Sequence, residues 1–191
     1  ETGHLSLYQL TIEPCTAFGD RFDHGKLKGL PEDDLAADLF ELTQELTESA
    51  GLPAYETSNH AAPGQESNHN LIYWRSEDWI GIGPGAHGRV TLNGKRVATE
   101  TPLGPAAWLE AVGIGNGENL RRELPDDDVQ IERVMMGLRL REGLPITEMN
   151  EYWFEINVLK EGGFLEVHDG NVRATRKGRP LLNAILRELL A

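Results

Sequence analysis

An amphipathic helical pattern between two strand patterns is the feature of this chain that most constrains its fold. The run His4–Glu13 alternates apolar and polar side chains and has apolar residues on both faces, as a buried strand does. Before Gly51, apolar residues recur at helical spacing, at Leu35, Leu39, Leu42, Leu46 and Ala50. The segment PAYETS, residues 53–58, then predicts a second strand. This order predicts a parallel α/β arrangement, either a barrel or an open sheet.

A hairpin and a glycine-rich linker are predicted further along the chain. Asn93-Gly94 stands between two alternating runs, and both residues tolerate the positive φ of a two-residue turn. A short helix is expected over Ala106–Val112. The segment GIGNGE, Gly113–Glu118, is rich in glycine and lies where the charge balance changes: residues 1–119 hold 7 basic and 18 acidic side chains, whereas residues 120–191 hold 11 and 13. We therefore expect two domains, residues 1–118 and 119–191.

The last third of the chain combines helical and strand patterns. Asp126–Arg141 and Ile146–Trp153 have helical character, and two short strands are expected around Asp169-Gly170. Thr175 can cap a closing helix that is rich in leucine. Five residues of this unit are expected to be buried: Met135, Leu138, Leu140, Leu182 and Leu186. These patterns predict a small helical, winged-helix-like domain.

Composition excludes several classes of function. The net charge of −13 repels phosphate backbones and anionic lipid, so nucleic acid is not an expected partner. No apolar run is long enough to cross a membrane and no signal peptide opens the chain, which predicts a cytoplasmic protein and leaves peripheral membrane contact open. The single Cys15 cannot hold an iron–sulfur cluster alone. Because the chain opens inside a strand pattern, we expect it to be part of a longer protein.

The segment HNLIYWR, residues 69–75, has the residue types of a porphyrin site. His69 offers an imidazole for iron, Tyr73 and Trp74 are flat partners for a large ring, and Arg75 suits a carboxylate. The alternative is that residues 71–74 form a core strand, with His69 at a surface turn. Residue types alone do not separate these two interpretations.

The segment GIGPGAHG, residues 81–88, indicates a close approach of backbone to another group. Its four glycines remove side chains and allow unusual φ angles. A nucleotide or adenosine moiety could use such a surface, although the spacing differs from the dinucleotide-binding pattern. The alternative is a tight turn packed against a neighbouring strand.

Other candidate catalytic residues receive little support. Glu13, Glu56 and His60 lie at or just past strand ends, where α/β folds place their chemistry, but most such residues are simply solvated. Ser58, His60 and Asp20 could be combined as a hydrolase triad, but no nucleophile elbow accompanies them. We therefore assign no catalytic residue.

Six segments, in order, carry a resemblance to a known family. They are HLSLYQLTIEP, GLPAYETSNHA, HNLIYW, GIGPGAHG, MMGLRLREGL and RATRKGRPLLNAILRELL. Over nearly its whole length the chain resembles the carboxy-terminal portion of the haem chaperones, which are related to oxygen-independent coproporphyrinogen III oxidase among the radical S-adenosylmethionine (SAM) proteins. The resemblance implies the last strands and helices of a partial (β/α) barrel, followed by the winged-helix-like domain. It also implies an absent first half with a CxxxCxxC loop for a [4Fe–4S] cluster and most of the SAM pocket.

The resemblance assigns roles to individual residues. HNxxYW is the proposed haem-binding motif of that family, which implies haem contacts at His69, Asn70, Tyr73, Trp74 and Arg75, with His69 as the iron ligand. By analogy with the related oxidase, Tyr8, Thr11 and His87 fall near SAM. Cys15 departs from the family, which usually has glycine at that position.

Three functions follow as hypotheses. The resemblance implies a chaperone that binds haem and passes it to an acceptor such as a respiratory haem protein; this chain is not expected to catalyse alone. The alternative is part of a genuine coproporphyrinogen III dehydrogenase of porphyrin biosynthesis, against which HNLIYW argues. A DNA-binding winged helix is a third hypothesis, which the net charge opposes. It rests on four basic residues, Arg173, Arg176, Lys177 and Arg179.

Overall fold

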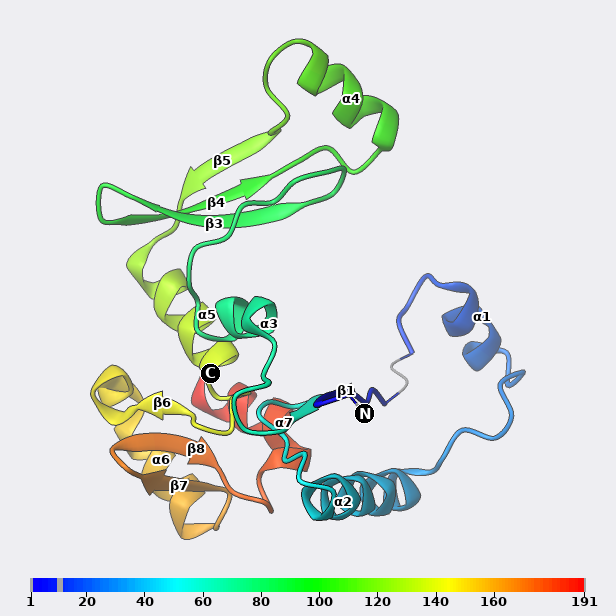
Figure 1. Ribbon diagram of the computed structural model, residues 1–191, viewed down its shortest axis with the longest axis vertical. Helices are drawn as coiled ribbons and strands as arrows, with labels where there is room; N and C mark the ends of the chain where they lie inside the picture. The colour runs from blue at the N-terminus through cyan, green and yellow to red at the C-terminus, as the bar shows by residue number, and fades with distance from the viewer. Residues whose placement is uncertain (1, 10–11, 191) are drawn as a thin grey trace. The chain divides into compact units, whose positions relative to one another are not determined.

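The chain folds into two compact units that divide between Glu66 and Ser67 in the computed structural model (Figure 1). The structure describes residues 2–9 and 12–190. The expected linker, Gly113–Glu118, lies within the second unit, between α4 (Pro105–Gly113) and β5 (Leu120–Glu123). A domain boundary at residue 118 stays a prediction.

The first unit contains a two-stranded antiparallel sheet. Its strands are β1 (His4–Ser6) and β2 (Asn59–Ala61), with His4 opposite Ala61 and Ser6 opposite Asn59. The predicted parallel pairing is wrong because the chain reverses between Tyr55 and Asn59, where the Tyr55 N–H donates to the Asn59 carbonyl at 3.1 Å. The segment after this reversal, β2, therefore pairs with β1 in place of PAYETS. The expected strand His4–Glu13 is also much shorter than predicted.

Two helices complete the first unit, α1 (Ala17–Asp23) and α2 (Asp33–Ser49). Helix α2 confirms the helical pattern, with Asp33 and Asp34 in its first turn and Gly51 at φ +76° just past its end. Its leucines nevertheless stay 45–62 % exposed, whereas Gln44 and Thr47 are buried. The face that α2 buries within the described chain is thus not its leucine stripe.

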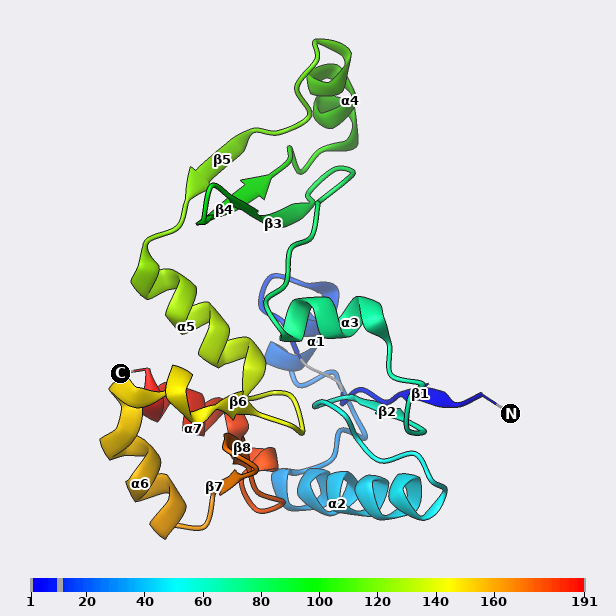
Figure 2. The same cartoon turned by 60° about the vertical axis from the view of Figure 1, so that its left-hand side comes forward.

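The second unit begins with α3 (Asn68–Trp74) and a three-stranded antiparallel sheet. The sheet orders β3 (His87–Leu92), β4 (Lys95–Glu100) and β5 side by side. The predicted hairpin is confirmed, because Asn93 and Gly94 join β3 to β4 with φ of 52° and 77°. Helix α3 packs against α5 (Asp126–Gly137), and the two helices lie close together in both views (Figures 1 and 2).

The end of the chain forms three helices and a small antiparallel sheet. After α5 come β6 (Leu144–Pro145), the 3-10 turns Ile146–Glu148 and Asn150–Tyr152, and α6 (Trp153–Glu161). Then follow the remaining elements, β7 (Leu165–His168), β8 (Asn171–Ala174), a 3-10 turn (Arg179–Leu181) and α7 (Leu182–Leu189). The turn at Asp169-Gly170 is confirmed, and the sheet order is β6-β8-β7. The sequence patterns did not predict β6.

One hydrophobic core holds these last elements together. Its least exposed members lie in α5, β6, α6, β7 and β8, just past α5, and between the two 3-10 turns: Val134, Leu138, Leu144, Met149, Ile156, Leu165 and Val172. The predicted burial of Leu138, Leu140, Leu182 and Leu186 is confirmed, but Met135 is 41 % exposed. Successive residues lie about 100° apart around a helix, so the core takes Val134 and turns Met135 outward.

No helix among residues 2–9 and 12–190 is both long and apolar enough to span a bilayer.

Candidate functional site

The segment HNLIYW is helix α3, so the alternative of a core strand is wrong. Ser67 caps the helix, and its Oγ accepts a hydrogen bond from the Asn70 N–H at 3.4 Å. None of the residues of α3 is fully buried. A serine two residues before the motif is an ordinary helix-start signal, which could have revealed this helix from the sequence.

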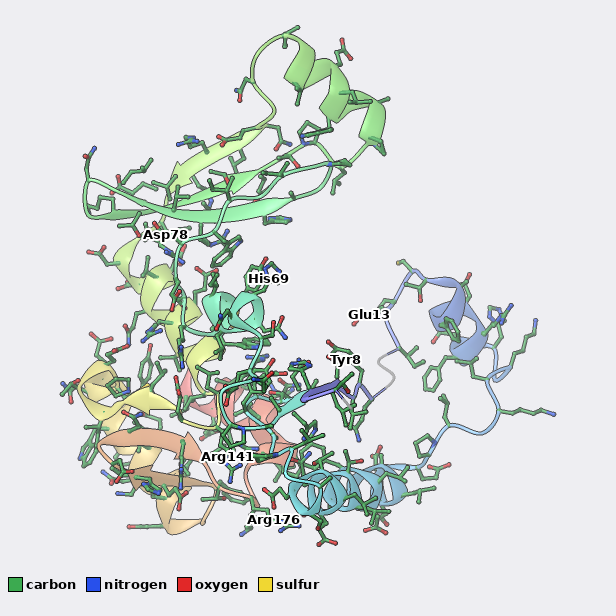
Figure 3. The ribbon with its side chains drawn as sticks, viewed as in Figure 1. Tyr8, Glu13, His69, Asp78, Arg141 and Arg176 are labelled. Carbon is green, nitrogen blue, oxygen red and sulfur yellow. The ribbon has the colours of Figure 1, made fainter. Side chains whose placement is uncertain are left out.

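The His69 side chain is exposed and bonded to the tyrosine one helical turn later. Its Nε2 lies 3.2 Å from the Tyr73 hydroxyl, and the two rings meet edge to face with centroids 4.9 Å apart. Tyr73 in turn meets Trp79 edge to face at 4.9 Å. The Tyr73 hydroxyl thus restrains the imidazole while leaving it accessible. Figure 3 labels His69 on α3 and Asp78 in the segment that leads to β3.

Trp79 joins this aromatic group to the glycine-rich segment, a role that sequence reasoning missed. Its indole Nε1 donates to the His87 carbonyl at 3.1 Å, and its backbone exchanges two hydrogen bonds with Arg89. The guanidinium groups of Arg89 and Arg96 lie 5.8 and 5.5 Å from the centre of its ring. A tryptophan five residues past the motif was the available signal.

Trp74 and Arg75 both interact with residues that follow α5. The Arg139 guanidinium lies 5.8 Å from the centre of the Trp74 ring. Arg75 donates from Nε and Nη2 to the two carboxylate oxygens of Glu142, at 3.0 and 3.2 Å. Sequence reasoning did not identify Glu142, because no local pattern connects residues 67 positions apart.

Arg133 fastens the end of α3 to α5. Its Nη1 donates to the Arg75 carbonyl, and its Nε donates to Glu148 Oε2 at 2.8 Å. A cation beside the last carbonyls of a helix is favourable because these carbonyls carry partial negative charge. The carboxy end of the motif is therefore positioned by residues of the last third of the chain.

The glycines of GIGPGAHG serve the packing of this segment, as the tight-turn alternative predicted. A Cβ on Gly81 would lie 2.5 Å from the His87 carbonyl oxygen, and one on Gly88 would lie 2.5 Å from Thr99 Oγ1. Gly83 and Gly85 have φ of 106° and 70°, which disfavours any other residue there. The His87 side chain is exposed, and its Nδ1 lies 3.9 Å from a Glu100 carboxylate oxygen.

The remaining predicted residues belong to the first unit. Tyr8 lies just after β1 and is 73 % exposed. Thr11 lies outside the described residues. The structure thus brings His69, Tyr73, Trp74 and Arg75 together on one helix and its cap. Among residues 2–9 and 12–190, no group of three or more His, Cys, Asp or Glu side chains is arranged to hold a metal ion.

Asp78 anchors the segment between α3 and β3. Its carboxylate accepts from the Thr91 N–H at 2.7 Å, the Thr91 hydroxyl at 2.8 Å and Arg96 Nη1 at 2.5 Å. The Thr91 N–H, aided by the hydroxyl and Arg96 and opposed by partial burial, lowers the pKa of the Asp78 carboxyl below its ordinary value.

This lowered pKa predicts how Asp78 contributes to stability as pH changes. Folding lowers the pKa of this carboxyl, so it stabilises the protein fully at pH values above its pKa in the unfolded chain, about 3.9. The stabilisation is lost as the pH falls through the lower pKa of the folded protein. We expect Asp78→Asn to lower the unfolding midpoint at pH 7 and to do so progressively less below pH about 4. Urea unfolding across this range measures the difference, with Glu77→Gln as the charge control. An Asp78→Asn effect that is independent of pH would contradict the assignment.

Comparison with known proteins gives one matching family model. That of the HemN C-terminal domain matches residues 124–181, which run from just before α5 to the turn before α7.

Several curated relatives match almost the whole chain. The heme chaperone HemW of Escherichia coli is 36 % identical over 98 % of this chain and 50 % of its own length. HemW of Mycobacterium tuberculosis is 34 % identical over 98 % and 47 %. Radical S-adenosyl methionine domain-containing protein 1, mitochondrial, of Danio rerio is 34 % identical over 98 % and 46 %. The chain thus spans about half the length of these relatives.

A solved structure has the same fold over this part. The coproporphyrinogen III oxidase HemN of Escherichia coli, described as a radical SAM enzyme, matches 98 % of this chain and 48 % of its own with a TM-score of 0.69. The identity is 18 %, so this likeness concerns the fold alone. The mixed α/β class predicted from the sequence is confirmed.

Proposed function

We propose that this chain, which belongs to the HemW/HemN-like family of radical SAM proteins, is the carboxy-terminal half of a haem chaperone and contributes to its haem site. Two relatives named heme chaperone support this choice, since they match 98 % of the chain at 34 % and 36 % identity. As part of the same proposal, the other half of the full-length protein supplies a [4Fe–4S] cluster and most of a SAM site. An acceptor for haem, such as a respiratory haem protein, is a further part of it.

The observation that carries the proposal is the exposed His69 imidazole held by Tyr73 on α3. A histidine ligand to iron is typically oriented by a hydrogen bond from its second ring nitrogen, and Tyr73 offers a partner of that kind. The partly buried Trp74 offers an apolar face for a porphyrin, and Arg75 already holds a carboxylate in two-point geometry. The residues therefore fit haem, with Asn70 beside them on the helix.

A second candidate is part of a coproporphyrinogen III dehydrogenase. The HemN C-terminal domain model and the fold of HemN favour it. The HNLIYW motif favours the chaperone instead. Haem binding by the full-length protein separates the two, because an oxidase of this kind needs a porphyrinogen substrate rather than retained haem. The assignment of Tyr8, Thr11 and His87 to SAM binding, carried over from the related oxidase, stays a prediction under either candidate.

Trp74→Ala is expected to weaken haem binding about three- to tenfold while leaving the spectrum of bound haem nearly unchanged. The reason is that the indole removes apolar ring surface from water but donates no ligand to iron. Haem titration of the full-length protein, followed by absorption, measures both quantities.

Trp153→Ala is the matched control for Trp74→Ala. Trp153 is also a partly exposed helical tryptophan with a cation beside its ring, Lys160 at 5.6 Å, but it lies on α6. Equal losses of affinity in both variants would mean that Trp74 has no special role in the site.

A further inference from the structure

Glu142 occupies the position at which the proposed site needs a carboxylate from its ligand. Arg75 follows α3 directly, six residues and so about 9 Å along the helix axis from His69. The guanidinium donates to both oxygens of Glu142, the two-point arrangement that an arginine makes with any free carboxylate. The Glu142 carboxylate therefore uses the same two donors of Arg75 that a carboxylate of a ligand would use.

The pair is held more loosely than the other arginine pairs around α3 and Trp79. The side chains of Arg75 and Glu142 are 42 % and 51 % exposed, whereas those of Arg89 and Glu132 are 20 % and 22 % exposed. Arg96, which pairs with Asp78, is only 10 % exposed. Water and dissolved carboxylates can compete for an exposed pair, so exchange at Arg75 costs little.

The backbone of Glu142 does not have to move for such an exchange. Asn171 Nδ2, at the start of β8, donates to the Glu142 carbonyl at 3.1 Å. Arg133 separately holds the carbonyl of Arg75. Rotation of the Glu142 side chain would release the two hydrogen bonds that it accepts from the guanidinium while both backbones stay in place.

We propose that Glu142 is a specificity-determining positioning residue that competes with a carboxylate of the bound tetrapyrrole for Arg75. A haem propionate replaces the Glu142 carboxylate on the guanidinium, so no charge on Arg75 is left unpaired at either stage. A neutral ester cannot make this exchange. The site therefore selects tetrapyrroles with free carboxylates, an inference that rests on the proposed haem-binding function.

The test compares haem with its dimethyl ester in the full-length protein. Glu142→Gln removes the competing charge, and we expect it to tighten haem binding about two- to fivefold and to leave binding of the dimethyl ester unchanged. Glu166→Gln is the control for net charge, because Glu166 also pairs with an arginine, Arg173 at 2.7 Å, but lies on β7. It should leave both affinities unchanged.

A double-mutant cycle shows whether Glu142 acts through Arg75. Arg75→Gln should weaken haem binding, and Glu142→Gln should then have no further effect. The proposal is overturned if Glu142→Gln leaves haem affinity unchanged, if it changes the ester equally, or if its effect persists without Arg75. Haem that binds with a histidine-type spectrum in those cases leaves the proposed function standing. Absence of haem binding by the unmodified protein overturns both.

Discussion

His69→Ala is expected to shift the Soret band of bound haem clearly. Its main effect should be on the spectrum, and the loss of haem affinity should be the smaller effect. The imidazole would supply the bond to iron, whereas Tyr73 and Trp74 would cover the large apolar ring, and these two contributions are largely independent. Because the His69 side chain is exposed and is not part of the hydrophobic core, the variant should fold normally. Haem titration of the full-length protein, read over the whole Soret region, measures both effects.

His168→Ala is the matched control for this experiment. His168 is also an exposed histidine of the second unit, with Nδ1 3.1 Å from Asp169, but it lies at the end of β7. It should leave the spectrum as it is. If His69→Ala leaves spectrum and affinity unchanged, while His60→Ala or His87→Ala alters them, the axial ligand has been assigned to the wrong histidine.

Gly143→Ala is expected to destabilise the carboxy-terminal part of the chain by roughly 2–5 kcal/mol. Gly143 has φ +72°, a conformation that costs an L-residue about 1–2 kcal/mol. A Cβ there would also collide with the Val172 carbonyl and press on the Arg173 Cβ, and relieving such overpacking costs a further 1–3 kcal/mol, roughly. Denaturant unfolding followed by far-UV circular dichroism measures the loss.

Gly163→Ala separates the two causes. Gly163 has nearly the same backbone angle, φ +74°, but a Cβ there would meet nothing within 4 Å. It should therefore show only the conformational cost, about 1–2 kcal/mol. Equal destabilisation by the two substitutions would contradict the close packing of Gly143 on β8.

Helices and tight turns could be predicted where adjacent residues decide them. The leucine spacing of α2 and the turns at Asn93-Gly94 and Asp169-Gly170 depend on residues a few positions apart, and all three are confirmed. Strand pairing in the first unit could not be predicted in this way. The reversal between Tyr55 and Asn59 decides which arm meets β1, and neither glycine nor proline marks it.

For the site, the chemical groups and their order along one segment could be identified from the sequence. An imidazole, two aromatic rings and a guanidinium within HNLIYWR have the chemistry of a porphyrin site, but residue types alone did not separate that interpretation from a core strand. The three-dimensional packing was needed to show that this segment is a helix with no fully buried residue, that Trp79 supports Tyr73, and that Glu142 holds Arg75. The reason is the distance along the chain over which each kind of interaction acts. Residue type and helical spacing act over one or two turns, whereas the partner of Arg75 is set by how α3 packs against α5, which brings together residues 67 positions apart.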